Sequence, residues 1–287
     1  MTKGVLIFAH NNRDVDYALL SLISGGLARK YLTVPVSLAT DKSTIAWCKE
    51  SGIYKQMCDV FDRIIEIEKP QTDNRRNLHD GTEMKSIAFV NTNRVSAWDI
   101  TPYDRTLLLD SDYLIFSSKF SQFWDIDDSV MISSAMTDIY DSKRVGYHDM
   151  YVSDTGPKLY WATTVMFTKN QEGKLFFDLV QYIRDNYQYY ADLFRFDSRQ
   201  FRNDIAFSVA KHILTGFQDD AKFNLPPTLT VQDRDILYDV SPQGKLTFFI
   251  ATDFSNGYVI AATEGLDLHI MNKQSIVRNK DRLLTLI

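Results

Sequence analysis

Cysteine is scarce in this chain of 287 residues, which contains only Cys48 and Cys58. Two thiols at this spacing are too few for a disulfide framework or a zinc site, so we expect both to be reduced and the protein to be cytoplasmic. No apolar run approaches the ~18 residues that a membrane span needs. The first residues lead straight into an expected strand, without the pattern of a signal peptide. We therefore expect a protein that works in solution and has no membrane span.

Positive charge is also in short supply, because 32 Lys and Arg stand against 37 Asp and Glu and give a net charge of -5. A nucleic-acid-binding face needs clustered Lys and Arg, so this balance argues against nucleic acid as a partner. A local basic pocket for phosphates is still compatible with it. Hydrophobic residues make up 45% and charged residues 24% of the chain, which is typical of a globular protein. The length suffices for one large α/β domain or two small ones.

Two carboxylates follow one short apolar run. Residues 106–109 predict a buried strand, and Asp110 and Asp112 come directly after it. An unpaired buried carboxylate is very costly, so we expect both acids where the strand emerges, paired with a cation or with strong hydrogen-bond donors. If the backbone is extended there, residues two apart point to the same side and suit Mg²⁺ or Mn²⁺. Asp-x-Asp is also common in solvated turns, but the apolar residues 113–116 that follow favour the metal.

The N-terminal part of the chain alternates strands and helices. Short apolar runs predict strands, and helical spacing predicts helices; the strands are 4–9, 33–40 and 61–67, and the helices 15–30 and 44–50. This order is typical of a parallel, doubly wound sheet, whose ligands bind beyond the carboxyl ends of the strands. Polar clusters at 10–12, 41–43 and 110–112 follow three predicted strands, so we expect them to share one binding edge.

The polar stretch 69–83 is predicted to be a loop. It contains His79 and Asp80, for which a solvated loop is favoured over a metal or base pair. Residues 86–98 are predicted to form a helix from which Arg94 projects toward the metal end of the sheet. The acidic cluster 124–128 is expected to lie on the surface.

The C-terminal half continues with strands 130–135 and 160–168 and with helices 175–187 and 203–214. The last helix starts with Asn203 and Asp204, and capping is a sufficient structural explanation for Asp204. Strands 245–251 and 258–262 are predicted to be joined by an Asn-Gly turn at 255–257. His269 lies alone in the apolar run 266–270, which by itself is more typical of a core histidine than of a metal ligand.

The segment Trp98-x-Ile100-Thr101-x-Tyr103, followed by the strand and Asp110-Ser111-Asp112, resembles the GT-A glycosyltransferases. It is most similar to the glycogenin-like group, glycosyltransferase family 8, and looks like divergent phage or bacterial members. The resemblance is weak in sequence but runs in consistent order from Val5 to about Lys273. It implies an α/β GT-A fold, Rossmann-like, with a mostly parallel central sheet, helices on both faces and Asp-x-Asp at a strand end. It further implies a single domain over 1–287, with a nucleotide-binding half (1–116) and an acceptor half that closes the metal site (117–287).

The same resemblance implies a set of site residues. Mn²⁺ or Mg²⁺ and the diphosphate of a nucleotide-sugar donor would be bound at Asp110, Asp112 and His269. The donor would also contact the end of the first strand and several polar or basic groups, namely Ala9, His10, Asn11, Tyr17, Arg94, Ser111 and Lys273. Catalysis near the transferred sugar is expected to involve Asp204, Arg94 and Asn203. The chain departs from the family pattern at Ala162-Thr163-Thr164 and after His269, where the family's Gly and Pro-Trp are missing.

The predicted function is therefore metal-dependent transfer of a sugar from a nucleotide-diphosphate sugar to an unknown acceptor. The resemblance implies retention, whereas inversion would need a carboxylate base, for which Asp204 is the candidate. One alternative is a nucleotidyltransferase, which usually has a Gly-rich phosphate loop that residues 9–14 lack. The other is a non-catalytic nucleotide-sugar-binding protein, against which Asp110, Asp112, Arg94 and His269 together argue. A glycan, a lipid-linked sugar, a protein and a DNA base all remain open as acceptor, as does the oligomeric state.

Overall fold

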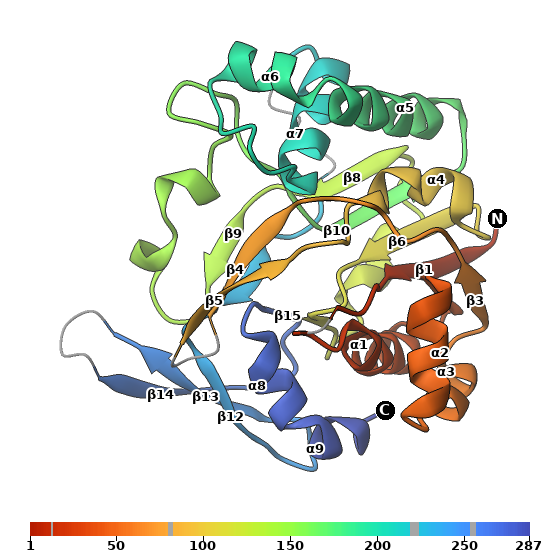
Figure 1. Ribbon diagram of the computed structural model, residues 1–287, viewed down its shortest axis with the longest axis vertical. Helices are drawn as coiled ribbons and strands as arrows, with labels where there is room; N and C mark the ends of the chain where they lie inside the picture. Colours follow the sequence, from red (N-terminus) through yellow and green to blue (C-terminus); the bar gives the residue numbers. More distant parts are fainter. Residues whose placement is uncertain (13, 80–82, 219–223, 253–256) are drawn as a thin grey trace.

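The computed structural model describes residues 1–12, 14–79, 83–218, 224–252 and 257–287. At its centre is a six-stranded sheet with the order β3-β2-β1-β6-β10-β8 (Figure 1). The strands β3, β2, β1 and β6 are parallel, whereas β10 is antiparallel to both of its neighbours. Their bounds are β1 Lys3–Phe8, β2 Val36–Thr40, β3 Arg63–Glu66, β6 Arg105–Leu109, β8 Val130–Ser133 and β10 Trp161–Thr168.

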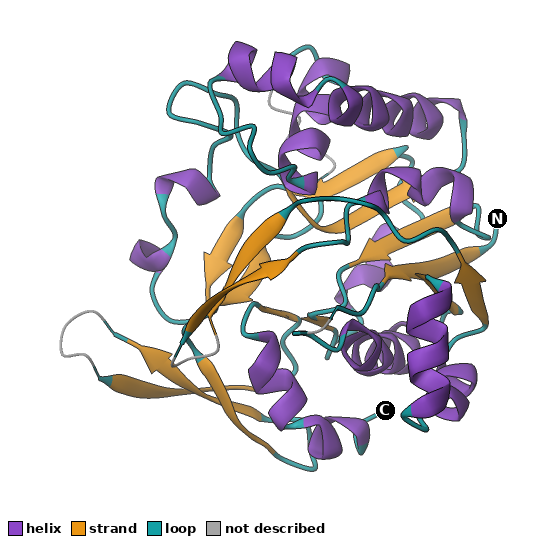
Figure 2. Ribbon diagram, in the orientation of Figure 1, coloured by secondary structure: helices purple, strands orange, loops and turns teal. Residues whose placement is uncertain are grey.

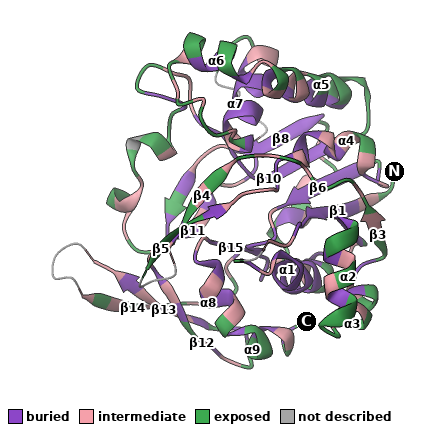
Figure 3. Cartoon of the chain, viewed as in Figure 1, coloured by how far each residue is buried: buried purple, intermediate pink, exposed green. Residues whose placement is uncertain are grey.

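Helices cover both faces of this sheet (Figure 2). One face packs against α1 (Tyr17–Leu32), α2 (Lys42–Glu50), α3 (Tyr54–Val60), α8 (Lys273–Arg278) and α9 (Lys280–Leu284). The other packs against α4 (Ala97–Ile100), α5 (Gln171–Asp185), α6 (Tyr187–Phe194) and α7 (Asn203–Leu214). Successive strand residues point to opposite faces, so Ile7 and Leu107 join one apolar cluster while Leu6 and Leu108 join the other. The central strands are accordingly buried on both sides (Figure 3), and the predicted α/β class with a mostly parallel sheet is confirmed.

Three smaller sheets surround the central one. The first has the order β7-β15-β11-β9, with β7 Tyr113–Leu114, β15 Leu268–Ile270, β11 Thr228–Val231 and β9 Met136–Asp138. In it, His269 pairs with Tyr113, the residue after Asp112, so this sheet carries the C-terminal segment to the Asp-x-Asp motif. The second is β12 (Ile236–Val240), β13 (Leu246–Ala251) and β14 (Tyr258–Thr263), and the third is the hairpin of β4 (Arg75–His79) and β5 (Met84–Ala88).

Short 3₁₀ helices complete the described elements: η1 Asn93–Ser96, η2 Lys119–Phe123, η3 Ser142–Arg144 and η4 Tyr147–Asp149. Within the described ranges, no helix combines the length and the apolar character that crossing a bilayer requires.

Most of the predicted elements are confirmed, and the helix 203–214 has the predicted bounds. Two predictions are wrong. The loop 69–83 contains β4, and the helix 86–98 is replaced by the end of β5 followed by short helical turns at 93–100. The hairpin exists because Leu78 and Ile87 are buried in the main apolar cluster, a tertiary contact that overrides weak local propensity. Asp80 and the turn residues 255–256 lie outside the described residues.

Helix α5 also differs from its prediction, since it begins at Gln171 and ends at Asp185, and α6 follows it as a separate helix. The backbone of the acidic cluster 124–128 has a structural role, because two of its carbonyl oxygens accept hydrogen bonds from a buried arginine. Arg105, the first residue of β6, is 1% exposed, and its guanidinium donates to the carbonyl oxygens of Asp128, Phe123 and Ile126. A buried cation therefore ties the start of β6 to the following connection.

We expect Arg105→Met to lower the free energy of unfolding by about 3 kcal/mol or more, because it leaves several buried carbonyl oxygens without a donor. Urea unfolding measures this value. The matched control is Lys3→Met, which removes an ion pair between Lys3 and the largely exposed Asp125 and should cost about 0–1 kcal/mol. Equal effects of the two variants would contradict a special role for Arg105.

Candidate active site

Asp110 and Asp112 lie in a tight turn that follows the buried strand β6. The backbone amide of Asp110 donates to Thr163 O on β10 (3.0 Å), and that of Tyr113 donates to Asp110 O (3.1 Å). Ser24 of α1 also stabilises this turn, because its hydroxyl donates to Tyr113 O at 2.8 Å. The extended backbone considered for this motif is therefore wrong, and the turn is what brings the two carboxylates together.

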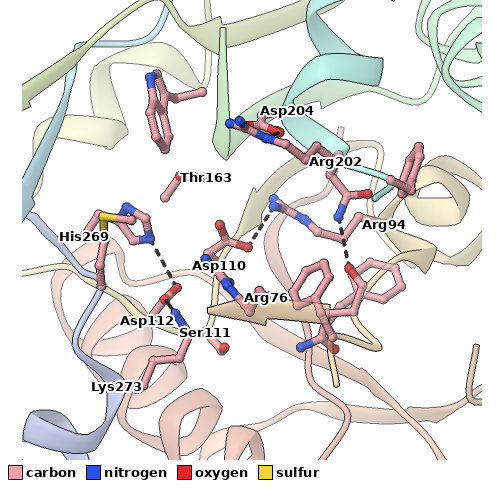
Figure 4. A pocket seen from close by; sticks show the side chains of 18 of the residues that line it. Arg76, Arg94, Asp110, Ser111, Asp112, Thr163, Arg202, Asp204, His269 and Lys273 are labelled. Carbon is pink, nitrogen blue, oxygen red and sulfur yellow. Dashed lines mark hydrogen bonds and ion pairs between the residues drawn. The ribbon is translucent and has the colours of Figure 1, made fainter. Parts of the chain in front are cut away.

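Each of the two acids has a buried cation as a partner (Figure 4). Arg94 Nη1 lies 2.7 Å from Asp110 Oδ1, and Lys273 Nζ contacts Asp112 Oδ2. The residues Arg94 and Lys273 are 4% and 2% exposed. His269 Nε2 lies 3.5 Å from Asp112 Oδ1. Because buried ions are tolerated when paired, these contacts explain how β6 can end in two carboxylates.

The two acids differ in their ionisation. Burial raises the pKa of Asp110, and the nearby Arg94 offsets only part of this effect. Burial acts in the same direction on Asp112, but Lys273 and His269 outweigh it and hold the pKa of Asp112 well below its usual range. Burial lowers the pKa of Lys273, and the negative charge of Asp112 counteracts part of this decrease. Asp112 is thus a firmly ionised carboxylate in a closed environment.

The residues Asp110, Asp112 and His269 fit a divalent metal ion. Each offers one ligand atom, and these atoms all lie within 4.8 Å of one another. Two carboxylate oxygens and one imidazole nitrogen suit Mn²⁺ or a similar ion. His269 Nδ1 is buried and makes no hydrogen bond, so the ring is not committed to a structural partner on that side. The three residues that were predicted to bind a metal ion therefore lie together in the structure.

A cavity of about 400 Å³ opens beside these acids. Several of its lining side chains have buried polar atoms without a hydrogen-bond partner: Tyr17 Oη, Arg94 Nε and Nη2, Asn203 Oδ1 and His269 Nδ1. Buried polar groups in folded proteins are nearly always satisfied. A group of unsatisfied donors and acceptors around one cavity therefore indicates a polar ligand.

Residues 9–11, at the end of β1, were predicted to contact the donor. They are less accessible than such a contact requires. Ala9 and His10 are 0% exposed, and His10 Nδ1 lies 2.8 Å from Asp41 Oδ2 while Nε2 faces Asn93. Asn11 uses its side-chain oxygen to accept from Ala18 N (2.7 Å). None of the three belongs to the cavity lining, which does include Tyr17, Ser111, Arg94 and Lys273. A donor contact at residues 9–11 thus stays a prediction.

The start of α7 also lines the cavity, through Asn203 and Asp204. Asp204 is not the N-cap of α7, because that position is Arg202, which makes no side-chain capping hydrogen bond. Asp204 lies in the first turn, where a carboxylate is favoured by the helix dipole, and its Oδ1 accepts from Ile205 N at 3.0 Å. The carboxylate of Asp204 also pairs with Arg202, with Arg202 Nε 3.1 Å from Oδ1 and Nη2 in contact with Oδ2. Asn203 Nδ2 donates to Asn91 O at 3.0 Å. Asp204 is therefore held by a salt bridge at the cavity wall.

Sequence reasoning missed further lining residues, notably Arg76, Trp161 and Arg202. Arg76 lies on the hairpin that was predicted to be a loop, and the pair Arg75-Arg76 in that polar stretch was the one available signal. Trp161 begins a correctly predicted strand, but the local sequence does not show whether its side chain lines a cavity or packs in the core.

Comparison with known proteins gives structural matches alone. No family model matches the sequence, and no curated protein matches it. An active-site mutant of LgtC matches with a TM-score of 0.46 and 14% identity, over 72% of this chain and 69% of that chain. The galactosyltransferase LgtC in complex with donor and acceptor sugar analogs gives 0.43 and 15%, over 71% and 68%. Apo-form GlyE from Streptococcus pneumoniae TIGR4 gives 0.41 and 13%, over 78% of this chain and 44% of that one.

These solved structures belong to glycosyltransferases. This chain is similar to them at low identity.

The buried His10 predicts a pH dependence of stability. Burial lowers the pKa of His10, so the folded state keeps it neutral while the unfolded chain takes up a proton below pH ~6.5. The unfolded state then binds more protons, and the free energy of unfolding falls as the pH drops. We expect His10→Gln to be less stable than wild type at pH 7.5, with a difference that narrows toward pH 5.5. Urea unfolding at both pH values tests this, and a difference that widens would mean that the fold favours protonated His10.

Proposed function

We propose that this protein is a metal-dependent glycosyltransferase that moves a sugar from a nucleotide-diphosphate sugar to an acceptor. The observation that carries the proposal is the Asp110-Asp112-His269 cluster, whose ligand atoms lie within 4.8 Å at the wall of a cavity that also contains Arg94 and Lys273. The two carboxylates and the imidazole suit a divalent ion. The buried cations suit an anionic leaving group that binds together with this ion.

A divalent ion held there would stabilise the negative charge that develops on the departing diphosphate. The protein's own cations would act in the same direction. Arg94 and Lys273 are now paired with Asp110 and Asp112. Once those carboxylates bind an ion, the two cations lose part of their partners and face the cavity. Because they are buried, their attraction for phosphate oxygens is weakly screened by solvent.

Residues near the transferred sugar are proposed to be Arg94, Asn203 and Asp204. The free Nε and Nη2 of Arg94 and the free Oδ1 of Asn203 offer donors and an acceptor to sugar hydroxyls. Both oxygens of Asp204 are engaged by Arg202. This contact favours a carboxylate that stabilises positive charge over one that accepts a proton, and thus supports the proposed retention of configuration.

The nucleotidyltransferase alternative is disfavoured by the backbone after β1. A phosphate loop needs backbone amides that point at the ligand. Here the amides of residues 9–11 already donate within the protein, to Ala39 O, Asn91 Oδ1 and Thr44 Oγ1. The amides of residues 14 and 15 both donate to Asn12 Oδ1. In the described part of this segment, these amides are not available to phosphates.

We also propose that residues 1–287 form a single catalytic domain. One apolar cluster extends from Val5 to Leu286. Residues of the 1–116 and 117–287 halves therefore share a core, which supports one folding unit with the cavity between them.

The proposal predicts metal-dependent stabilisation by nucleoside diphosphates. A panel of UDP, GDP, ADP, CDP and dTDP, each with and without Mn²⁺, should raise the melting temperature with at least one member, because ligands that bind the folded state stabilise it. Thermal unfolding followed by fluorescence measures the shift. If no diphosphate gives a metal-dependent shift in folded protein, the proposed function is wrong.

We expect Asp112→Asn to abolish this shift, since it removes the ionised ligand of the metal. Each variant is compared with its own metal-free melting temperature, because Asp112→Asn also leaves the buried Lys273 without its partner. Asp178→Asn is the matched control, as Asp178 is an exposed acid on α5 that pairs with Lys174. A full metal-dependent shift in Asp112→Asn would contradict the proposed metal site.

A further inference from the structure

We propose that Arg76, on the β4–β5 hairpin, is a further diphosphate-binding residue that acts together with Arg94 and Lys273. This inference rests on the proposed function and assigns to the hairpin a part of the donor site. It also predicts that the leaving group of the donor is a diphosphate and not a monophosphate.

The register of the hairpin turns Arg76 inward. Arg76 pairs with Ile87 and lies two residues before Leu78, and side chains two apart in a strand share a face. Leu78 and Ile87 are both buried in the main apolar cluster, so this is the face toward the protein. Arg75 lies on the opposite face of the strand, and its Nε donates to Ser86 Oγ at 3.0 Å, although it too is part of the cavity lining.

The guanidinium of Arg76 is part of the cavity wall (Figure 4). Its central carbon lies 5.2 Å from the ring centroid of Phe89, which also lines the cavity. A guanidinium that rests on an aromatic face keeps its N–H groups free at the edge. Arg76 can therefore donate to a ligand without leaving its position.

Arg76 lies among groups that an anion would satisfy. Arg76 and Lys273 both line the cavity. The buried hydroxyl of Tyr17 lies beside Arg76 and also lines the cavity. No carboxylate forms an ion pair with Arg76 in the described ranges. Two cations that line the same cavity repel each other, and an anion bound near both would lower that cost.

The hairpin is held firmly over the cavity. Asn74, next to β4, donates to Phe201 O (3.0 Å) and accepts from Phe201 N (3.1 Å). At the same end of the hairpin, Asn12 Nδ2 donates to the carbonyl oxygen of Ala88, which pairs with Arg75, at 2.9 Å. A guanidinium that is fixed before the ligand arrives loses little conformational entropy on binding.

The number of cations favours two phosphates over one. With a divalent ion on Asp110 and Asp112, the groups Arg94, Lys273 and Arg76 all lack a full carboxylate partner. A diphosphate spreads its charge over more oxygen atoms than a monophosphate and can contact all three. It also gains charge as the sugar departs, so the same contacts strengthen toward the products.

The test compares Arg76→Gln with Lys85→Gln. Lys85 is an exposed cation on the same hairpin, outside the cavity lining, and pairs with Glu83. Calorimetric titration measures the affinity of wild type and both variants for UDP, GDP, ADP, CDP and dTDP with Mn²⁺, and for the matching nucleosides. We expect Arg76→Gln to weaken diphosphate binding about tenfold or more, as the loss of a charge-assisted hydrogen bond does. Lys85→Gln should change it less than about twofold.

Two further readouts separate phosphate binding from a structural role. Arg76→Gln should leave nucleoside affinity unchanged, and Arg76→Lys, which keeps the charge, should recover part of the diphosphate affinity. Equal weakening of nucleoside and diphosphate, or unchanged diphosphate affinity in Arg76→Gln, would overturn the inference while the proposed function stands. If wild type binds no diphosphate with Mn²⁺, the proposed function itself fails.

Discussion

The structure depends on how two carboxylates are tolerated at the end of a fully buried strand. Asp110 and Asp112 follow β6, which is covered on both faces, and each is paired with a cation that is itself nearly inaccessible. The register of β15 against β7 carries His269 to the same place, and Lys273 begins α8 a few residues later. The small four-stranded sheet thus connects the C-terminal segment to the motif that it neutralises.

This arrangement gives the site two electrostatic states. In one, Arg94 and Lys273 neutralise the acids, and the buried charges are balanced within the protein. In the proposed second state, a divalent ion would take their place and the cations would become available to an anionic ligand. Because the ion pairs with Arg94 and Lys273 balance the two acids, we expect the fold not to depend on the metal, in contrast to many small metal-binding domains. Metal and anion are instead expected to bind together, since each removes an unfavourable charge that the other creates.

Much of the central sheet could be predicted from the sequence, because its strands are short apolar runs between clear turn signals. The Asp-x-Asp motif and its neighbours were found for the same reason. The β4–β5 hairpin could not, since its strands contain Arg, Asn, His and Lys and are fixed by the burial of Leu78 and Ile87 against distant elements. Residues 10–12 and 41–43 were predicted to share one edge of the sheet, but the hydrogen bond between His10 and Asp41 and the burial of His10 could not be predicted. Tertiary contacts, not local pattern, decide both features.

The hydrogen bonds between Asn74 and Phe201 join residues that are 127 positions apart in the chain. Contacts of such separation close late during folding, because the loop entropy must be overcome before the contact contributes. The position of the hairpin thus depends on Phe201, which lies between α6 and α7. Because the cavity lining also includes Trp161, Asn203 and His269 from the second half of the chain, we expect a nascent chain that lacks this half to have the two acids but no formed cavity around them.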